Sequence, residues 1–170
     1  MIRLIKPSKK YKKSFIDGRK ELQREEKTKK ENIRKLEKDF SGFVKQMRGY
    51  EKGRNLPKGH VSSSYYWLMN GSTWIGETTI RHKLTKKLLK EGGHIGYGIR
   101  PTKRKLGYGK KILALALRKA QKLGFKKVLV TCNDDNIGSR KIIEANGGVL
   151  QNVIKRNGKH KRRYWIGPIT

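Results

Sequence analysis

Gly107 and Gly109 lie where a long helical pattern begins, and they are the first candidates for a ligand-binding site in this chain. Because glycine has no Cβ, a ligand can come close to its backbone N–H group. The first amides of a helix have no partner inside the helix, and the helix dipole makes that end positive. The stretch therefore predicts a binding site for a ligand that carries phosphate groups. Four cationic side chains surround the two glycines: Arg104, Lys105, Lys110 and Lys111.

A simpler interpretation of the same residues stays open at this point. Glycines before a helix often form only a tight turn, and lysine and arginine often only solvate a surface. A single Gly-x-Gly is weak evidence on its own. The segments that flank it favour the phosphate site.

The order of these motifs resembles the GNAT superfamily of acyl-CoA-dependent N-acyltransferases. The family signature is Arg/Gln-x-x-Gly-x-Gly/Ala between a strand and a helix, and it corresponds here to residues 104–109. The family's Asn-x-x-Ser at the start of the next helix corresponds to Asn136 and Ser139. The resemblance is specific over residues 65–165. Three more segments look like a bacterial subfamily labelled only as predicted acetyltransferases: 81–84, 94–98 and 144–148.

This resemblance implies that acetyl-CoA is the co-substrate and that an amine is the acceptor. Backbone amides at the start of the helix would bind the pyrophosphate, with Arg104 and Lys105 adding charge. The residues implied for this contact, besides those two, are Leu106, Gly107, Tyr108, Gly109, Lys110 and Lys111.

Two further parts of CoA have implied partners. Ile99 and Arg100 would meet the pantetheine through the main chain of a splayed strand edge, which also donates an N–H to the thioester oxygen. Asn136 and Ser139 would contact the far arm of the cofactor. Asn136 can equally be a plain helix N-cap, and the two roles are compatible.

The general base is less clear from the sequence. Glu77 lies in the middle of a strand pattern, where a carboxylate is unfavourable without a reason, so it is the first candidate. A surface ion pair with one of the many lysines explains Glu77 equally well. His82 and His94 are the next candidates, because imidazole has a suitable pKa. The carboxylates between residues 61 and 170 are few: Glu77, Glu91, Asp134, Asp135 and Glu144.

The general acid has no match to the family pattern. Many family members carry a tyrosine seven residues after the asparagine, and this chain has Ile143 there. Tyr97 and Tyr108 do not match that position, so another group or water protonates the thiolate, or the thiolate leaves unassisted. Cys132 is predicted to be a buried, inert thiol, because no base accompanies it in the sequence.

The charge of the chain favours anionic partners. There are 44 Lys plus Arg against 13 Asp plus Glu, a formal net charge of +31. Such a field attracts polyanions and repels cationic substrates. A nucleic-acid or ribosome-binding module on the same scaffold is therefore a second hypothesis, although the aromatic platform of RNA-binding domains is missing. A third hypothesis is an acyl-CoA-binding regulator without turnover.

Composition sets further expectations. A single cysteine excludes an internal disulfide and fits a reducing compartment. The scattered His and Cys residues do not have metal-ligand spacing, so no metal is expected. Neither a signal peptide nor a membrane-spanning run is recognisable, which predicts a cytoplasmic protein. The oligomeric state is left open.

The elements that must position these residues can be predicted from pattern. The 170 residues suit one domain, with a variable segment 1–60 of one strand and two helices, followed by a core over 61–170. Strands that alternate with helices and end in a hairpin indicate an α/β fold, with a mixed, mostly antiparallel sheet covered on both faces.

The expected elements have these boundaries. A strand is predicted at 2–5, a helix capped by Ser8, and a second helix over the apolar stripe 33–47, with Gly18 and residues 27–30 marking the break between the helices. Hairpins are predicted at Asn70-Gly71 and Asn157-Gly158, and a helix from Gly107 to Leu123.

Overall fold

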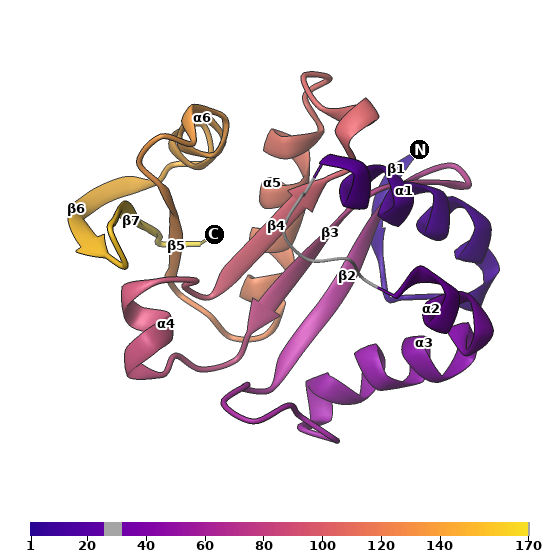
Figure 1. Ribbon diagram of the computed structural model, residues 1–170. Coiled ribbons are helices and arrows are strands. Elements are labelled where there is room, and N and C mark those ends of the chain that lie inside the picture. Colours follow the sequence, from indigo (N-terminus) through magenta and orange to yellow (C-terminus); the bar gives the residue numbers. More distant parts are fainter. Residues whose placement is uncertain (26–31, 170) are drawn as a thin grey trace.

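Two antiparallel sheets form the framework of the protein. The computed structural model describes residues 1–25 and 32–169 (Figure 1). The first sheet has the strand order β1-β2-β3-β4, and the second has the order β5-β7-β6. The strands are β1 (Ile2–Ile5), β2 (Ser63–Asn70), β3 (Thr73–Arg81), β4 (Ile95–Ile99), β5 (Val128–Asn133), β6 (Val149–Arg156) and β7 (Lys159–Ile166).

Helices cover both faces of the first sheet, as predicted. The helices α1, α2 and α3 lie on one face and α5 lies on the other (Figure 1). The helices are α1 (Lys12–Glu25), α2 (Ile33–Lys38), α3 (Phe40–Gly49), α4 (Lys86–Lys90), α5 (Tyr108–Lys122) and α6 (Ile137–Glu144). Short 3-10 turns are η1 (Lys9–Tyr11), η2 (Tyr50–Lys52) and η3 (Pro101–Lys103).

A separate hydrophobic cluster fills each face of the first sheet. Under α1, the ring of Phe15 stacks on Trp67 with a centroid distance of 4.4 Å. Under α5, the apolar stripe of the helix packs against β3, β4 and β5. The fully buried members of that stripe are Ile112, Leu113, Ala116 and Ala120. Burial of this apolar area is the main source of stability for both layers.

The two sheets meet at His94. Its backbone N–H donates to the carbonyl of Leu129 at 2.7 Å, and the Leu129 N–H donates to His94 Nδ1 at 2.9 Å. Gly93 must be glycine here, because its φ is +60° and a Cβ would lie 2.4 Å from the Leu129 carbonyl oxygen. Beyond this junction β4 and β5 belong to different sheets.

The N-terminal helices differ from the prediction in three places. Ser8 precedes a 3-10 turn and its side chain makes no capping bond. Gly18 lies inside α1 instead of ending it, because the Trp74 ring packs against the helix there and would stand 2.4 Å from a Cβ. The stripe 33–47 forms two helices, since the Asp39 carboxylate accepts from the Gly42 N–H at 2.8 Å and starts α3 anew. The predicted break at 27–30 lies outside the described residues.

Both predicted hairpins are present. Asn157 and Gly158 take positive φ values of 50° and 73° at the second turn. At the first turn only Gly71 has a positive φ, of 58°, while Asn70 remains the last residue of β2. The helix predicted from Gly107 to Leu123 is α5, and these two residues are its caps.

Candidate functional site

A cavity of about 680 Å³ lies beside the carboxyl end of β4, with walls from the start of α5 and the first turns of α6. It brings together residues that are up to 48 positions apart in the sequence, from Tyr97 to Ala145. Of the residues predicted to bind the cofactor, eight line this cavity: Ile99, Arg104, Lys105, Gly107, Gly109, Lys110, Asn136 and Ser139.

The start of α5 presents bare backbone to the cavity. Gly107 has a φ of 78°, and nothing lies within 4 Å of where a Cβ would stand. No side chain caps the first turn of α5, so its amides point outward without an intramolecular acceptor from the cap. Arg104 lies next to them, and its Nε donates to the Ile99 carbonyl at 3.0 Å. This arrangement suits an anionic group.

Gly109 has a packing role in addition to its place in the cavity wall. A Cβ at this position would stand 2.4 Å from Cδ1 of Ile142. The glycine therefore lets α6 approach the first turn of α5 closely. Asn136 starts α6 as an N-cap, because its Oδ1 accepts from the Ser139 N–H at 2.9 Å.

Four predicted cofactor residues do not line the cavity: Arg100, Leu106, Tyr108 and Lys111. Arg100 turns toward α1, where Nη2 lies 2.6 Å from Glu21 Oε1. The Leu106 side chain is exposed, and the Tyr108 hydroxyl accepts from the Asn70 amide at 3.1 Å. The side chains of Arg100 and Tyr108 thus have partners outside the cavity.

Six lining residues were not predicted: Tyr97, Gly98, Gly138, Lys141, Ile142 and Ala145. The last four follow the helical spacing i, i+3, i+4, i+7 on α6, so periodicity alone could have found them once the position of that helix was known. Tyr97 and Gly98 lie in the segment 94–98 that carried the family resemblance.

Tyr97 is the phenol of the cavity wall. Its hydroxyl donates to Ser139 Oγ at 3.3 Å and to the Ser139 carbonyl at 3.4 Å. Burial raises the pKa of Tyr97 to about 12. The hydroxyl therefore keeps its proton at any physiological pH.

Glu77 lies on the other face of the first sheet. It pairs in register with Gly98 of β4 and with Trp67 of β2, on the side covered by α1. Its Oε1 is 3.0 Å from Nη1 of Arg19, a residue of α1. Nothing lies within 4 Å of a Cβ built on Gly98, so the surface of β4 beside Glu77 is open.

Neither candidate histidine lines the cavity. His82 follows β3, and its Nε2 lies 2.9 Å from Oγ of the buried Ser64. Burial lowers the pKa of His82, an effect that the nearby Glu51 carboxylate opposes. His94 accepts the Leu129 N–H at the sheet junction, and burial, with a smaller contribution from the charge of Arg81, lowers its pKa. Both rings have structural contacts.

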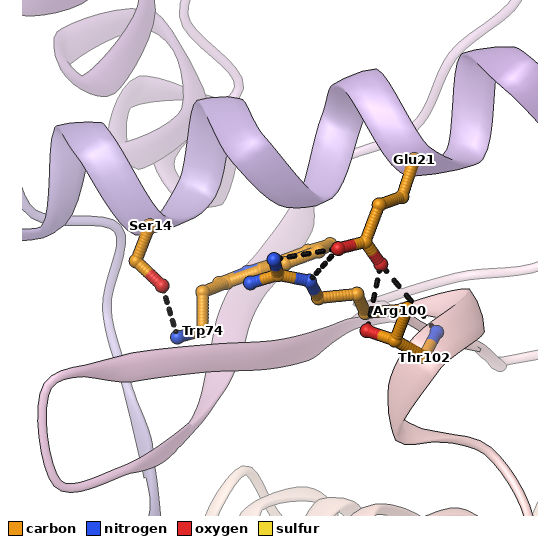
Figure 2. Close-up of polar contacts among 5 residues, drawn as sticks. All are labelled: Ser14, Glu21, Trp74, Arg100 and Thr102. Atoms are coloured by element: carbon orange, nitrogen blue, oxygen red, sulfur yellow. Dashed lines mark hydrogen bonds and ion pairs between the residues drawn. The ribbon is translucent and has the colours of Figure 1, made fainter.

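The carboxylate of Glu21 ties α1 to the end of β4 (Figure 2). Oε1 accepts from Nε and Nη2 of Arg100 at 2.9 and 2.6 Å, and Oε2 accepts from the Thr102 hydroxyl at 2.8 Å. Two turns earlier on α1, the Ser14 hydroxyl accepts the Trp74 N–H at 2.8 Å. The helix is therefore fixed to both β3 and η3.

Glu21→Gln is expected to lower the free energy of unfolding by about 2 kcal/mol at pH 7, because hydrogen bonds to charged groups are worth about 1.5–3 kcal/mol. The Arg100 hydrogen bonds are the main reason why the pKa of Glu21 is below its ordinary value of 4.5. A carboxylate whose pKa is lower in the folded than in the unfolded state stabilises the protein at pH values above its unfolded-state pKa. This contribution is lost as the pH falls through the folded-state pKa. Urea unfolding at pH 7 and pH 3 should show a difference from wild type that shrinks at the lower pH.

Glu37→Gln is the matched control, since Glu37 of α2 pairs with Lys20 of α1 at 2.8 Å and its side chain is 39% exposed. Its effect should stay within about 0.5 kcal/mol. Equal effects of the two substitutions on the free energy of unfolding would mean that the Glu21 contacts stabilise the protein no more than a surface ion pair does.

The family model of the GNAT acetyltransferase domain matches residues 21–149. The chain belongs to the GNAT acetyltransferase family. It is an acetyl-CoA-dependent acyltransferase, and the cavity at the start of α5 is where the signature Arg104-x-x-Gly107-x-Gly109 lies. A search of curated proteins finds no significant match in sequence.

Solved GNAT structures share the fold over 98–99% of this chain. The microcin self-immunity acetyltransferase MccE, in complex with acetyl-CoA and AMP, is 16% identical with a TM-score of 0.69, covering 98% of this chain and 92% of its own. RimJ of Mycobacterium smegmatis, in complex with a CoA disulfide, is 14% identical with a TM-score of 0.73, covering 98% and 81%. The spermidine/spermine N-acetyltransferase SpeG of Vibrio cholerae is 12% identical with a TM-score of 0.63, covering 99% and 95%.

This GNAT chain departs from the common family pattern at Ile143, which is fully buried in the core. Cys132 is also buried, as predicted, and burial raises the pKa of its thiol. Within residues 1–25 and 32–169, no three His, Cys, Asp or Glu side chains gather as a metal site would require. In the same described part of the chain, no helix is both long and apolar enough to cross a membrane.

Proposed function

We propose that this GNAT protein transfers the acetyl group of acetyl-CoA to a primary amine by direct attack in a ternary complex. The observation that carries the proposal is the cavity between β4, α5 and α6, where an uncapped helix start meets a free strand edge. A pyrophosphate fits the first, and an extended amide chain such as pantetheine fits the second.

The cofactor would be held mainly by main-chain groups. Backbone amides from Gly107 to Lys110 would bind the pyrophosphate, and Arg104 and Lys105 would add charge. The Ile99 carbonyl accepts from the Arg104 side chain and not from β3, so the peptide groups of Ile99 point away from β3. Its N–H is then placed to stabilise the oxyanion that forms at the thioester carbonyl.

The amine would approach from the opposite face of β4. There the Glu77 carboxylate lies beside the open surface of Gly98 and can accept the proton that the amine loses, directly or through one water. Glu77 also pairs with Arg19, but it lies opposite Gly98 of β4, whereas His82 and His94 contact Ser64 and Leu129 away from that position. Glu77 is therefore the preferred base.

The net charge of +31 bears on the acceptor. A polyamine is the acceptor named for one structural neighbour, SpeG, and AMP is bound to another, MccE. The positive field of this chain would repel a polyamine and attract an amine whose remaining groups are anionic.

Two measurements test the proposed function. Calorimetric titration with acetyl-CoA should give saturable binding, and a thiol-release assay over a panel of amines should give turnover. Binding without turnover on any amine would favour an acyl-CoA-binding regulator. Absence of binding, together with retention on RNA that falls steeply with salt, would favour the nucleic-acid module instead.

A further inference from the structure

We propose that Tyr97 is a catalytic residue of this acetyl transfer, and that its hydroxyl donates a hydrogen bond to the sulfur of CoA while the carbon–sulfur bond breaks. The inference rests on the proposed function, because it assigns a group in the same site. It supplies the leaving-group stabilisation for which the sequence offers no candidate at Ile143.

The position of Tyr97 on β4 is the first reason. Tyr97 pairs with Thr78 of β3, one position away from the pair formed by Gly98 and Glu77. Because successive side chains of a strand point to opposite faces, Tyr97 and Glu77 lie on opposite faces of the sheet. The amine and the leaving sulfur would thus be served by different groups, with the β4 backbone between them.

The weak attachment of the hydroxyl is the second reason. Its two contacts, with Oγ and the carbonyl of Ser139, measure 3.3 and 3.4 Å. Ordinary O–H···O bonds measure about 2.5–3.0 Å, so both contacts are long. A hydroxyl held this loosely, in a wall of the cavity, can turn to a new acceptor at little cost.

The other candidate groups are committed or hidden. Ile143 has no polar atom and is fully buried. The Tyr108 hydroxyl is bonded to Asn70, and the Tyr164 hydroxyl donates to Glu144 Oε1 at 2.9 Å. Cys132 is buried and does not line the cavity. Of the two hydroxyl side chains that line the cavity, Ser139 accepts from Tyr97, so Tyr97 is the donor of this pair.

The step balances without proton transfer from Tyr97. The amine nitrogen bonds to the carbonyl carbon, the carbon–sulfur bond breaks with its electron pair on sulfur, and the amine proton passes to Glu77. The pKa of Tyr97, about 12, is well above that of an ordinary thiol, about 8.5. The phenol therefore stabilises the thiolate as a hydrogen-bond donor and keeps its own proton.

The decisive experiment measures the thiol of bound CoA and the turnover of Tyr97→Phe. In the wild-type complex, the thiolate absorbance of CoA should titrate about one to two pH units below that of free CoA. Tyr97→Phe should remove this difference and lower kcat about 10–100-fold, while the KM for acetyl-CoA stays within about threefold.

Tyr66→Phe is the matched control, because Tyr66 of β2 pairs with Thr78 on the same face but does not line the cavity. It should leave both the thiol titration and kcat unchanged. An unshifted thiol in the wild-type complex, or a shift that persists in Tyr97→Phe, would overturn the inference even if acetyl-CoA binds and amines are acetylated. A wild-type protein that binds no CoA would instead overturn the proposed function.

Discussion

Gly107→Glu should lower the affinity for CoA at least about 100-fold. Gly107 lines the cavity, and the position of an added Cβ is open space, so the new side chain would extend into the volume that a phosphate needs. The carboxylate would also repel the pyrophosphate. At a separation of about 5 Å and an effective dielectric constant of about 20, this repulsion is about 3 kcal/mol, which alone corresponds to about a 100-fold change.

Gly124→Glu provides a control with the same backbone cost. Gly124 follows the other end of α5, has a φ of 88°, and likewise has nothing within 4 Å of a built Cβ. Each substitution forces an ordinary residue into the left-handed region at a cost of about 1–2 kcal/mol, so both variants should lose similar stability. Calorimetric titration with CoA should then show a large loss of affinity for Gly107→Glu and none for Gly124→Glu. Equal affinities would show that the phosphate does not lie at the start of α5.

Local patterns predict the part of the site that is built from consecutive residues. The glycines at 107 and 109, the flanking cations and the N-cap at Asn136 are all visible within a few positions of the elements that they start. The same holds for the turn at Asn157 and Gly158, where the residue types fix the backbone geometry.

Contacts between distant segments could not be predicted in this way. Arg100 was expected to meet the pantetheine through its main chain, but its N–H donates to the Ile75 carbonyl at 2.9 Å. Its side chain pairs with Glu21, 79 residues earlier. Gly18 resembles a helix end, and only the packing of Trp74 explains a glycine inside α1. The place of Tyr97 in the cavity depends on where α6 lies relative to β4, and no local pattern encodes that arrangement.

The helix α1 connects the two halves of the proposed site. Arg19 pairs with Glu77 on the acceptor side. Glu21 holds the end of β4 through Arg100, and Glu25 lies 2.6 Å from Arg104 at the cofactor cavity. Three ion pairs from one helix thus reach the proposed base, the strand edge and a side chain proposed to bind phosphate. A displacement of α1 would change all three at once.

Glu77→Gln should lower kcat about 100–1000-fold and leave the dissociation constant for CoA within about twofold. The amide keeps the shape of the side chain but cannot accept the proton of the amine. The cofactor cavity lies on the opposite face of β4, so binding of CoA should not depend on this carboxylate. Activity of the variant should rise with pH, because more of the acceptor is then already deprotonated. The measurement is thiol release from pH 6 to 10 with the best amine of the panel.

Two further variants separate a catalytic carboxylate from one half of an ion pair. Glu37→Gln removes a carboxylate that pairs with α1 elsewhere, and it should leave kcat unchanged. Arg19→Gln removes the cation that lies 3.0 Å from Glu77 and leaves the carboxylate in place, so most of the turnover should survive. If Arg19→Gln is as inactive as Glu77→Gln, the ion pair itself is what matters, and the carboxylate acts by holding α1 against the sheet. If neither variant loses turnover, the base is another group.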